Sequence, residues 1–199
     1  MHLSAPAIIV AARPHGETAV IARMLTEQAG LVAAYIAGGR GRQLRPVVIP
    51  GNVVAAEIRA KSAGQLPYAR LELVESRGPF LTEPLPAAAI GWATSLTAAS
   101  LPELEAYPEL YEALGALLAA ICNAGAAREW LRAIVAYEVL VLRALGFGGG
   151  APPRGETLEG LVARFREQRK PLARHIFADR RGDILAARDL LAERLAKLV

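Results

Sequence analysis

The chain has 199 residues, and 53% of them are hydrophobic, which is enough apolar material for one large domain or two small ones. Its single cysteine excludes an internal disulfide framework and a cysteine-cluster zinc site. The uncharged stretches 84–102 and 113–127 contain prolines, glycines or polar side chains and are typical of buried helices, because a membrane span needs roughly 20 strongly apolar residues. We therefore expect no membrane partner and a cytoplasmic location.

The net charge of +4 is unevenly distributed along the chain. Residues 1–80 hold nine basic and five acidic side chains, residues 81–150 hold three and seven, and residues 151–199 hold eleven and seven. Two basic ends thus flank an acidic middle. This pattern favours a surface that faces a polyanion at one or both ends of the chain.

The first 76 residues have the pattern of five short strands. The predicted strands are Ala7–Arg13, Thr18–Thr26, Leu31–Ala37, Val53–Lys61 and Leu66–Ser76. The fourth alternates most clearly, with Val54, Ala56 and Ile58 on one face and charged side chains on the other, as in a half-buried strand. Turns at 28–30 and 50–52 separate neighbouring strands.

Five strands in fewer than 80 residues favour a closed five-stranded OB-fold barrel over a sandwich, which needs more strands, or a βαβ unit, which needs helices. The loop 38–45 leaves little room for a helix between the third and fourth strands, which is a departure from the general OB plan. In the third strand Tyr35 shares parity with Leu31 and Ala33, and this parity places it in the core.

A helical pattern begins after Pro84-Leu85-Pro86. The predicted helices are Ala87–Ala99, Pro108–Asn123, Arg128–Leu145, Thr157–Lys170, which Pro171 ends, and Asp183–Leu198, which Asp183 caps. Glu138 is the polar exception on the apolar face of the third helix. A Gly/Pro linker lies near 148–153. The fold class is therefore α+β, with an OB-fold domain at 1–80 and an all-helical domain at 81–199.

The loop from Gly39 to Pro46 is the strongest candidate for a binding site. Arg40, Arg42 and Arg45 fall within six positions of a glycine-containing loop, so they form a mobile cationic segment that can reach phosphates. An OB-fold carries such loops beside the face that holds single strands. The alternative is a solvated loop whose arginines pair with carboxylates.

The basic tail is a second candidate, with Arg166, Arg169, Lys170 and Arg174 at its centre and Arg180 and Arg181 beyond them. The first three lie at helical spacing on one face. This patch is either a second DNA contact, a dock for an acidic peptide or an ordinary solvated face.

Catalytic machinery is missing from the sequence. It has no P-loop, dinucleotide fingerprint, HExxH or GxSxG motif, and His2, His15 and His175 are too scattered for a metal site. His15 and Glu17 fit a turn better than an acid–base pair. We expect no enzyme activity, cofactor or metal. Tyr35 and Tyr68 are the barrel's aromatic side chains, so nucleic-acid affinity should be mostly electrostatic.

Several motifs taken together resemble the RecO recombination mediators. Those in the first half are Arg13-Pro14-His15-Gly16-Glu17-Thr18, Leu25–Val32, Gly38-Gly39-Arg40, Leu44-Arg45-Pro46 and Pro50-Gly51-Asn52. Those in the second half are Tyr107–Leu114 and Tyr137-Glu138 through Leu145-Gly146-Phe147. Many relatives carry a zinc-holding cysteine segment after the Leu-Gly-Phe motif, whereas Gly148–Pro153 follows it here, so zinc should be absent.

The resemblance implies a protein of the nucleoid that binds single- and double-stranded DNA, anneals strands and helps to load RecA onto coated single strands. It implies RecR and the acidic tail of the single-stranded-DNA-binding protein as partners. The family's basic barrel surface corresponds to Arg13, Arg23, Arg40, Arg42 and Arg45. Two other functions fit the residues alone: an OB-fold module that binds RNA, and a scaffold that binds proteins.

Overall fold

The computed structural model describes residues 2–60, 62, 64–148, 150–178 and 184–199. The predictions that concern Lys61, Arg180, Arg181 and Asp183 therefore lie outside the described residues. The chain divides into two compact units. The barrel unit comprises Met1–Thr82 with Leu101–Tyr111, and the helical unit comprises Glu83–Ser100 with Glu112–Val199.

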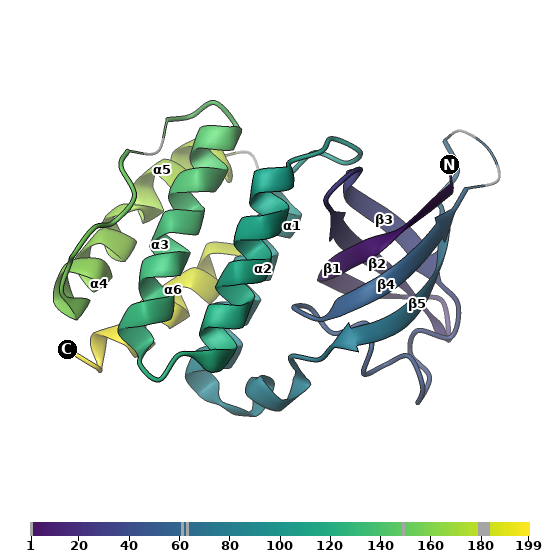
Figure 1. The fold of residues 1–199 in the computed structure, drawn as a ribbon, viewed down its shortest axis with the longest axis horizontal. Helices are drawn as coiled ribbons and strands as arrows, with labels where there is room; N and C mark the ends of the chain where they lie inside the picture. Colours follow the sequence, from purple (N-terminus) through teal and green to yellow (C-terminus); the bar gives the residue numbers. More distant parts are fainter. Residues whose placement is uncertain (1, 61, 63, 149, 179–183) are drawn as a thin grey trace. The chain divides into compact units, whose positions relative to one another are not determined.

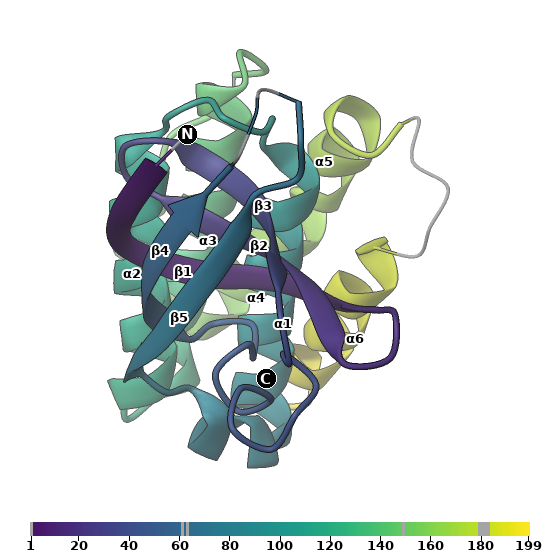
Figure 2. The same ribbon diagram turned by 90° about the vertical axis from the view of Figure 1, so that its right-hand side faces the viewer.

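The barrel unit contains five strands that close in the order β1-β2-β3-β5-β4 (Figures 1 and 2). Their bounds are β1 His2–His15, β2 Ala19–Thr26, β3 Gly30–Ile36, β4 Val53–Arg59 and β5 Tyr68–Glu75. The long β1 pairs with β4 through its first half and with β2 through its second half. A parallel pair, Tyr35 with Tyr68, joins β3 to β5. The predicted OB-fold barrel is confirmed.

The side chains of β4 alternate between the barrel core and the outer surface, as the sequence predicts. Val54, Ala56 and Ile58 lie in the core, whereas the alternate residues face outward and Arg59 among them is exposed. The prediction for Tyr35 was wrong, because the inward residues of β3 are those of the other parity, Val32, Ala34 and Ile36. Tyr35 lies on the outer face and is half-buried.

The segment between β3 and β4 closes one end of the barrel without a helix, as predicted. Val47 and Val48 are buried against the barrel core, and Leu44 packs there in part. Apolar side chains of an irregular loop thus cover the end of the barrel. This packing anchors the backbone of the loop next to Arg45.

The described helices of the rest of the chain are α1 Pro84–Ser100, α2 Pro108–Asn123, α3 Ala127–Ala144, α4 Leu158–Glu167, α5 Arg169–His175 and α6 Ile184–Ala196, and a short 3-10 helix, Gly78–Thr82, precedes them. The predicted stop at Pro171 was wrong. The helix ends earlier, at Glu167, and Pro171 lies in the first turn of α5, where a proline costs no backbone hydrogen bond.

The polar exception in α3 is explained by the fold of the helical unit. Glu138 is fully buried, and its carboxylate accepts hydrogen bonds from Arg188 in α6 and from the Trp92 indole in α1. Burial raises the pKa of Glu138, and the bonds from Arg188 and Trp92 oppose that effect. The pair holds three helices that are far apart in sequence against one another.

Candidate nucleic-acid interface

Three of the arginines predicted from the sequence surround one hollow on the barrel unit. Arg13 comes from the end of β1, and Arg40 and Arg45 come from the loop after β3. Together with Ala12, Pro14, Val20, Gly39 and Val48 they line a space of about 400 Å³. Arg42 is exposed on the same loop but does not line this space. We call the space the arginine hollow.

Arg40 connects the two segments that bound the arginine hollow. Its Nη1 donates to the carbonyl oxygens of Gly16, at 3.2 Å, and Glu17, at 2.9 Å. The backbone N–H of Arg40 donates to the Thr18 carbonyl at 2.9 Å. Arg40 therefore fixes the loop to the β1–β2 turn, and the freer cations of this loop are Arg42 and Arg45.

Asn52 fixes the other end of the loop, and its hydrogen bonds explain why the Pro-Gly-Asn motif ends in asparagine. Its Nδ2 donates to the carbonyls of Pro46, at 2.8 Å, and Val47, at 3.0 Å. Its Oδ1 accepts from the Arg77 backbone N–H at 2.7 Å. Since Asn52 is fully buried, these bonds hold the segment just after Arg45 to the strand that ends near Arg77.

Arg23 is not arranged like the other predicted arginines. Its Nη2 lies 3.3 Å from Oε1 of Glu103, and its side chain is 29% exposed. Both residues line a second hollow of about 340 Å³ with Ala11, Ala12, Arg13, Ile21 and Ala33. Arg13 therefore borders both hollows, whereas the charge of Arg23 is balanced by a carboxylate.

Glu103 belongs to a segment that lies along the start of β3. The Leu104 N–H donates to the Leu31 carbonyl at 2.9 Å, and Leu31 forms a parallel bridge with Glu103. Gly30 permits this approach, because a Cβ built there would lie 1.7 Å from the Glu105 carbonyl oxygen. The segment 103–105 thus lies against the start of β3, and Glu103 reaches the hollow that Arg13 also lines.

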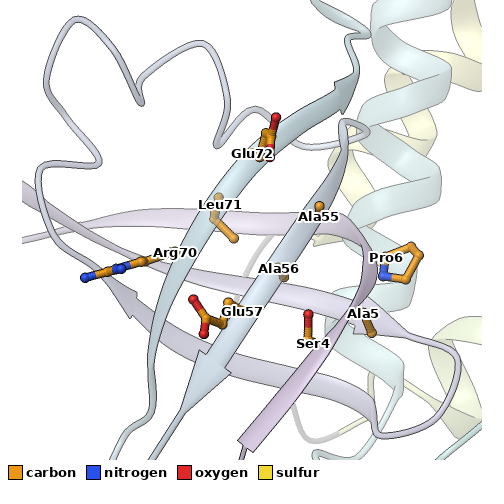
Figure 3. Close-up of a pocket in the computed structure, with 9 residues that line it drawn as sticks. All are labelled: Ser4, Ala5, Pro6, Ala55, Ala56, Glu57, Arg70, Leu71 and Glu72. Atoms are coloured by element: carbon orange, nitrogen blue, oxygen red, sulfur yellow. The ribbon is translucent and has the colours of Figure 1, made fainter.

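Another hollow, of about 470 Å³, lies on the outer side of β1, β4 and β5 and differs in charge (Figure 3). Its floor is made of small side chains such as Ser4, Pro6 and Ala55. Glu57 and Glu72 line it, and Figure 3 shows the Arg70 side chain pointing away from the other labelled residues. Two carboxylates against one arginine give this hollow a net negative lining, so it suits a phosphate less well than the arginine hollow does.

The basic patch predicted in the tail is spread over two helices and not over one face of a continuous helix. Arg166 lies in α4, and Arg169, Lys170 and Arg174 lie in α5. Arg169 donates two hydrogen bonds to Asp189, at 2.7 and 2.8 Å, and the pKa of Asp189 is lowered chiefly by the bond from Arg169. Arg166, Lys170 and Arg174 are exposed.

Comparison with known proteins identifies the family. The family model described as "Recombination protein O N terminal" matches residues 1–77, and "Recombination protein O C terminal" matches residues 83–148. The chain belongs to the RecO family. The resemblance seen in the short motifs is therefore confirmed, and both halves of the RecO pattern occur in the order that the family has.

Curated RecO proteins are similar to the chain over most of its length. "DNA repair protein RecO" of Caulobacter vibrioides strain NA1000 is 39% identical over 143 residues, which are 71% of this chain and 58% of the relative. The protein of the same name from Rhodospirillum centenum is 41% identical over 71% of this chain and 56% of its own length. The chain thus spans less than two thirds of these RecO relatives.

Three further observations concern this RecO-family chain. No group of three His, Cys, Asp or Glu side chains among the described residues is arranged to hold a metal ion. None of the described helices is both long and apolar enough to cross a membrane. The match to the RecO C-terminal model ends at residue 148, so α4, α5 and α6 lie outside it.

Proposed function

We propose that this chain is a DNA-repair mediator that binds single- and double-stranded DNA through the arginine hollow and the adjacent Arg42. The convergence of Arg13, Arg40 and Arg45 on one space carries this proposal. Family membership supplies the context of DNA repair. Arg23 is the exception among the predicted contacts, since it needs to leave Glu103 before it can bind a phosphate.

Electrostatics explains why these residues suit a nucleic acid. Arginine donates to phosphate oxygens through a planar fork, and each phosphate that it neutralises releases counterions. Such binding weakens as salt increases. The logarithm of the binding constant falls with the logarithm of the salt concentration, with a slope of roughly 0.7 per phosphate contact for single strands and 0.9 for duplex DNA. Arg42 and Arg45 lie on an exposed loop, where they can reach the backbone of either form.

The test is a fluorescence-anisotropy titration of labelled single- and double-stranded DNA at several salt concentrations. The variant is Arg42→Gln with Arg45→Gln, which leaves Arg40 to hold the loop. We expect lower affinity and a salt slope smaller by about 1.4 on single strands. Arg70→Gln, on the hollow of Figure 3, is the matched control and should bind like the parent protein.

Other outcomes separate the competing functions. Equal binding by the parent and the Arg42/Arg45 variant would reject the arginine hollow as the site. Tighter binding of RNA than of DNA of equal length would favour an RNA-binding module. A parent protein that binds no nucleic acid at low salt would favour a protein-binding scaffold.

The proposal extends to the reactions of a mediator, none of which needs a catalytic residue. The chain would anneal complementary strands by holding their phosphates and would help RecR load RecA onto coated single strands. An annealing assay with two labelled complementary oligonucleotides tests the first activity. A RecA-loading assay on coated DNA, with and without RecR, tests the second, and the Arg42/Arg45 variant should slow both.

The exposed cations of α4 and α5 are the proposed dock for the acidic tail of the single-stranded-DNA-binding protein. Arg166, Lys170 and Arg174 are available there, whereas Asp189 neutralises Arg169. Titration of a peptide with the sequence of that tail should therefore be weakened by Lys170→Gln with Arg174→Gln. Unchanged peptide affinity in that variant would place the dock elsewhere.

A further inference from the structure

We propose that Tyr35 and Tyr68 form a platform on which an unpaired base of a bound strand stacks, next to the arginine hollow. This inference rests on the proposed function, because it assigns a role to the surface beside the phosphate site. It adds a reason for the protein to distinguish unpaired from paired bases.

The strand register places the two tyrosines side by side on the outer face of the barrel. Tyr35 in β3 is the Cα partner of Tyr68 in β5. The alternate residues of these strands, such as Ala34 and Ala69, face the core, so both tyrosines point away from it. Tyr68 is 40% exposed and Tyr35 is half-buried.

The same register connects the tyrosines to the phosphate site. Arg13 in β1 pairs with Ile21 in β2, and Ile21 pairs with Tyr35. Arg13 and Tyr35 are thus two strand spacings apart, about 10 Å along the sheet. A strand whose phosphate contacts Arg13 can therefore lay a nearby base over Tyr35 or Tyr68.

The surroundings of the platform suit a base more than a phosphate. The His15 ring meets Tyr35 edge-on, with ring centroids 5.9 Å apart, and so extends the aromatic surface toward the β1–β2 turn. On the far side, Arg59 is the Cα partner of Tyr68 and is paired with Glu57. Since Glu57 balances the charge of that arginine, what the platform itself contributes to binding is ring surface.

Stacking on an exposed aromatic ring requires a base whose faces are free. A base inside a duplex is already stacked on its neighbours, whereas a base in a single strand is available. Loss of one such platform lowers affinity for single strands by about fivefold or more. Duplex affinity, which depends on phosphate contacts, should not change.

The experiment compares an oligothymidylate with an abasic oligonucleotide of the same length, so that the phosphates are equal and only the bases differ. The parent protein should bind the oligothymidylate about fivefold or more tightly. Tyr68→Leu and Tyr35→Leu should remove this difference and leave abasic binding unchanged, whereas Tyr68→Phe should keep it. The Arg42/Arg45 variant should lose affinity for both oligonucleotides.

A second measurement needs no variant. An oligonucleotide that contains 2-aminopurine should lose fluorescence on binding the parent protein, because stacking on a tyrosine ring quenches that base. Equal affinity of the parent for abasic and oligothymidylate strands, with no quenching, would overturn the platform and leave the arginine hollow as a phosphate site. Failure of the parent to bind either strand would overturn the proposed function and the platform together.

Discussion

Nε and Nη2 of Arg188 each donate a hydrogen bond to Glu138, at 2.8 Å, and neither side chain is exposed to solvent. The Trp92 indole donates to the same carboxylate at 2.7 Å, and the Arg188 guanidinium lies 3.9 Å from the centre of the Phe165 ring. A buried charge is costly unless it is paired and hydrogen-bonded. Each member of this pair is therefore tolerated because the other is present.

Removal of one partner should destabilise the helical unit strongly. Glu138→Gln leaves a buried guanidinium without its counter-charge, and Arg188→Met leaves a buried carboxylate, so each should cost about 3–5 kcal/mol. The double variant should cost less than the sum of the two. Urea unfolding of the four proteins measures this coupling, and additive costs would contradict it.

Gly30 and Gly16 form a matched pair for testing the segment 103–105. Both have positive φ, +63° and +57°, but a Cβ at Gly30 meets the Glu105 carbonyl whereas one at Gly16 meets nothing within 4 Å. Gly16→Ala should lower the free energy of unfolding by about 1 kcal/mol, because alanine tolerates this backbone conformation less well than glycine. Gly30→Ala should cost about 1–3 kcal/mol more, because the segment must move. Equal melting temperatures of the two variants would show that the contact does not matter.

Asn52 should matter both to stability and, indirectly, to DNA binding. Asn52→Ala leaves the Arg77 N–H and two loop carbonyls without their partner and should cost about 1–3 kcal/mol. The loop that carries Arg45 should then be less ordered, so DNA affinity should also fall. Asn52→Asp keeps the acceptor for Arg77 but not the two donors. Proteolysis of the loop should be faster in both variants than in the parent, and an unchanged rate would argue against this role.

Glu103→Gln should increase affinity for DNA. The substitution removes the charge that balances Arg23 and adds no new bulk, so Arg23 becomes available to a phosphate beside Arg13. An exposed ion pair of this kind is worth up to about 1 kcal/mol, which corresponds to an increase of about fivefold or less. Anisotropy titration measures the change. Glu72→Gln on the hollow of Figure 3 is the control, and an equal gain there would show that only net charge matters.

The fold was predictable where the sequence carries a local period. Val54, Ala56 and Ile58 alternate with outward side chains because one side of β4 is buried, and this is enough to identify a strand. The helix Pro108–Asn123 was predicted to the residue, since a proline suits the first turn. Periodicity cannot tell which parity faces inward when both parities are apolar, and Tyr35 was misplaced for that reason.

The candidate site was predictable as a set of arginines but not as an arrangement. Spacing cannot reveal that Arg40 donates to backbone carbonyls of the β1–β2 turn, or that Arg23 pairs with a carboxylate 80 residues later. The sequence motif at 50–52 predicts a turn, but it does not reveal the bonds that Asn52 makes to Pro46, Val47 and Arg77. Such contacts depend on which loops the closed barrel brings together, and no local pattern encodes them.

The two members of the buried pair in the helical unit are synthesised at different times. Arg188 follows Glu138 by 50 residues, so a ribosome that adds roughly 5–20 residues per second makes the carboxylate about 2.5–10 s before its counter-charge. The barrel unit has received its last residue, Tyr111, before either is made. A nascent chain therefore holds a complete barrel sequence while its helices still wait for α6, and the helical unit is the one that needs protection on the ribosome.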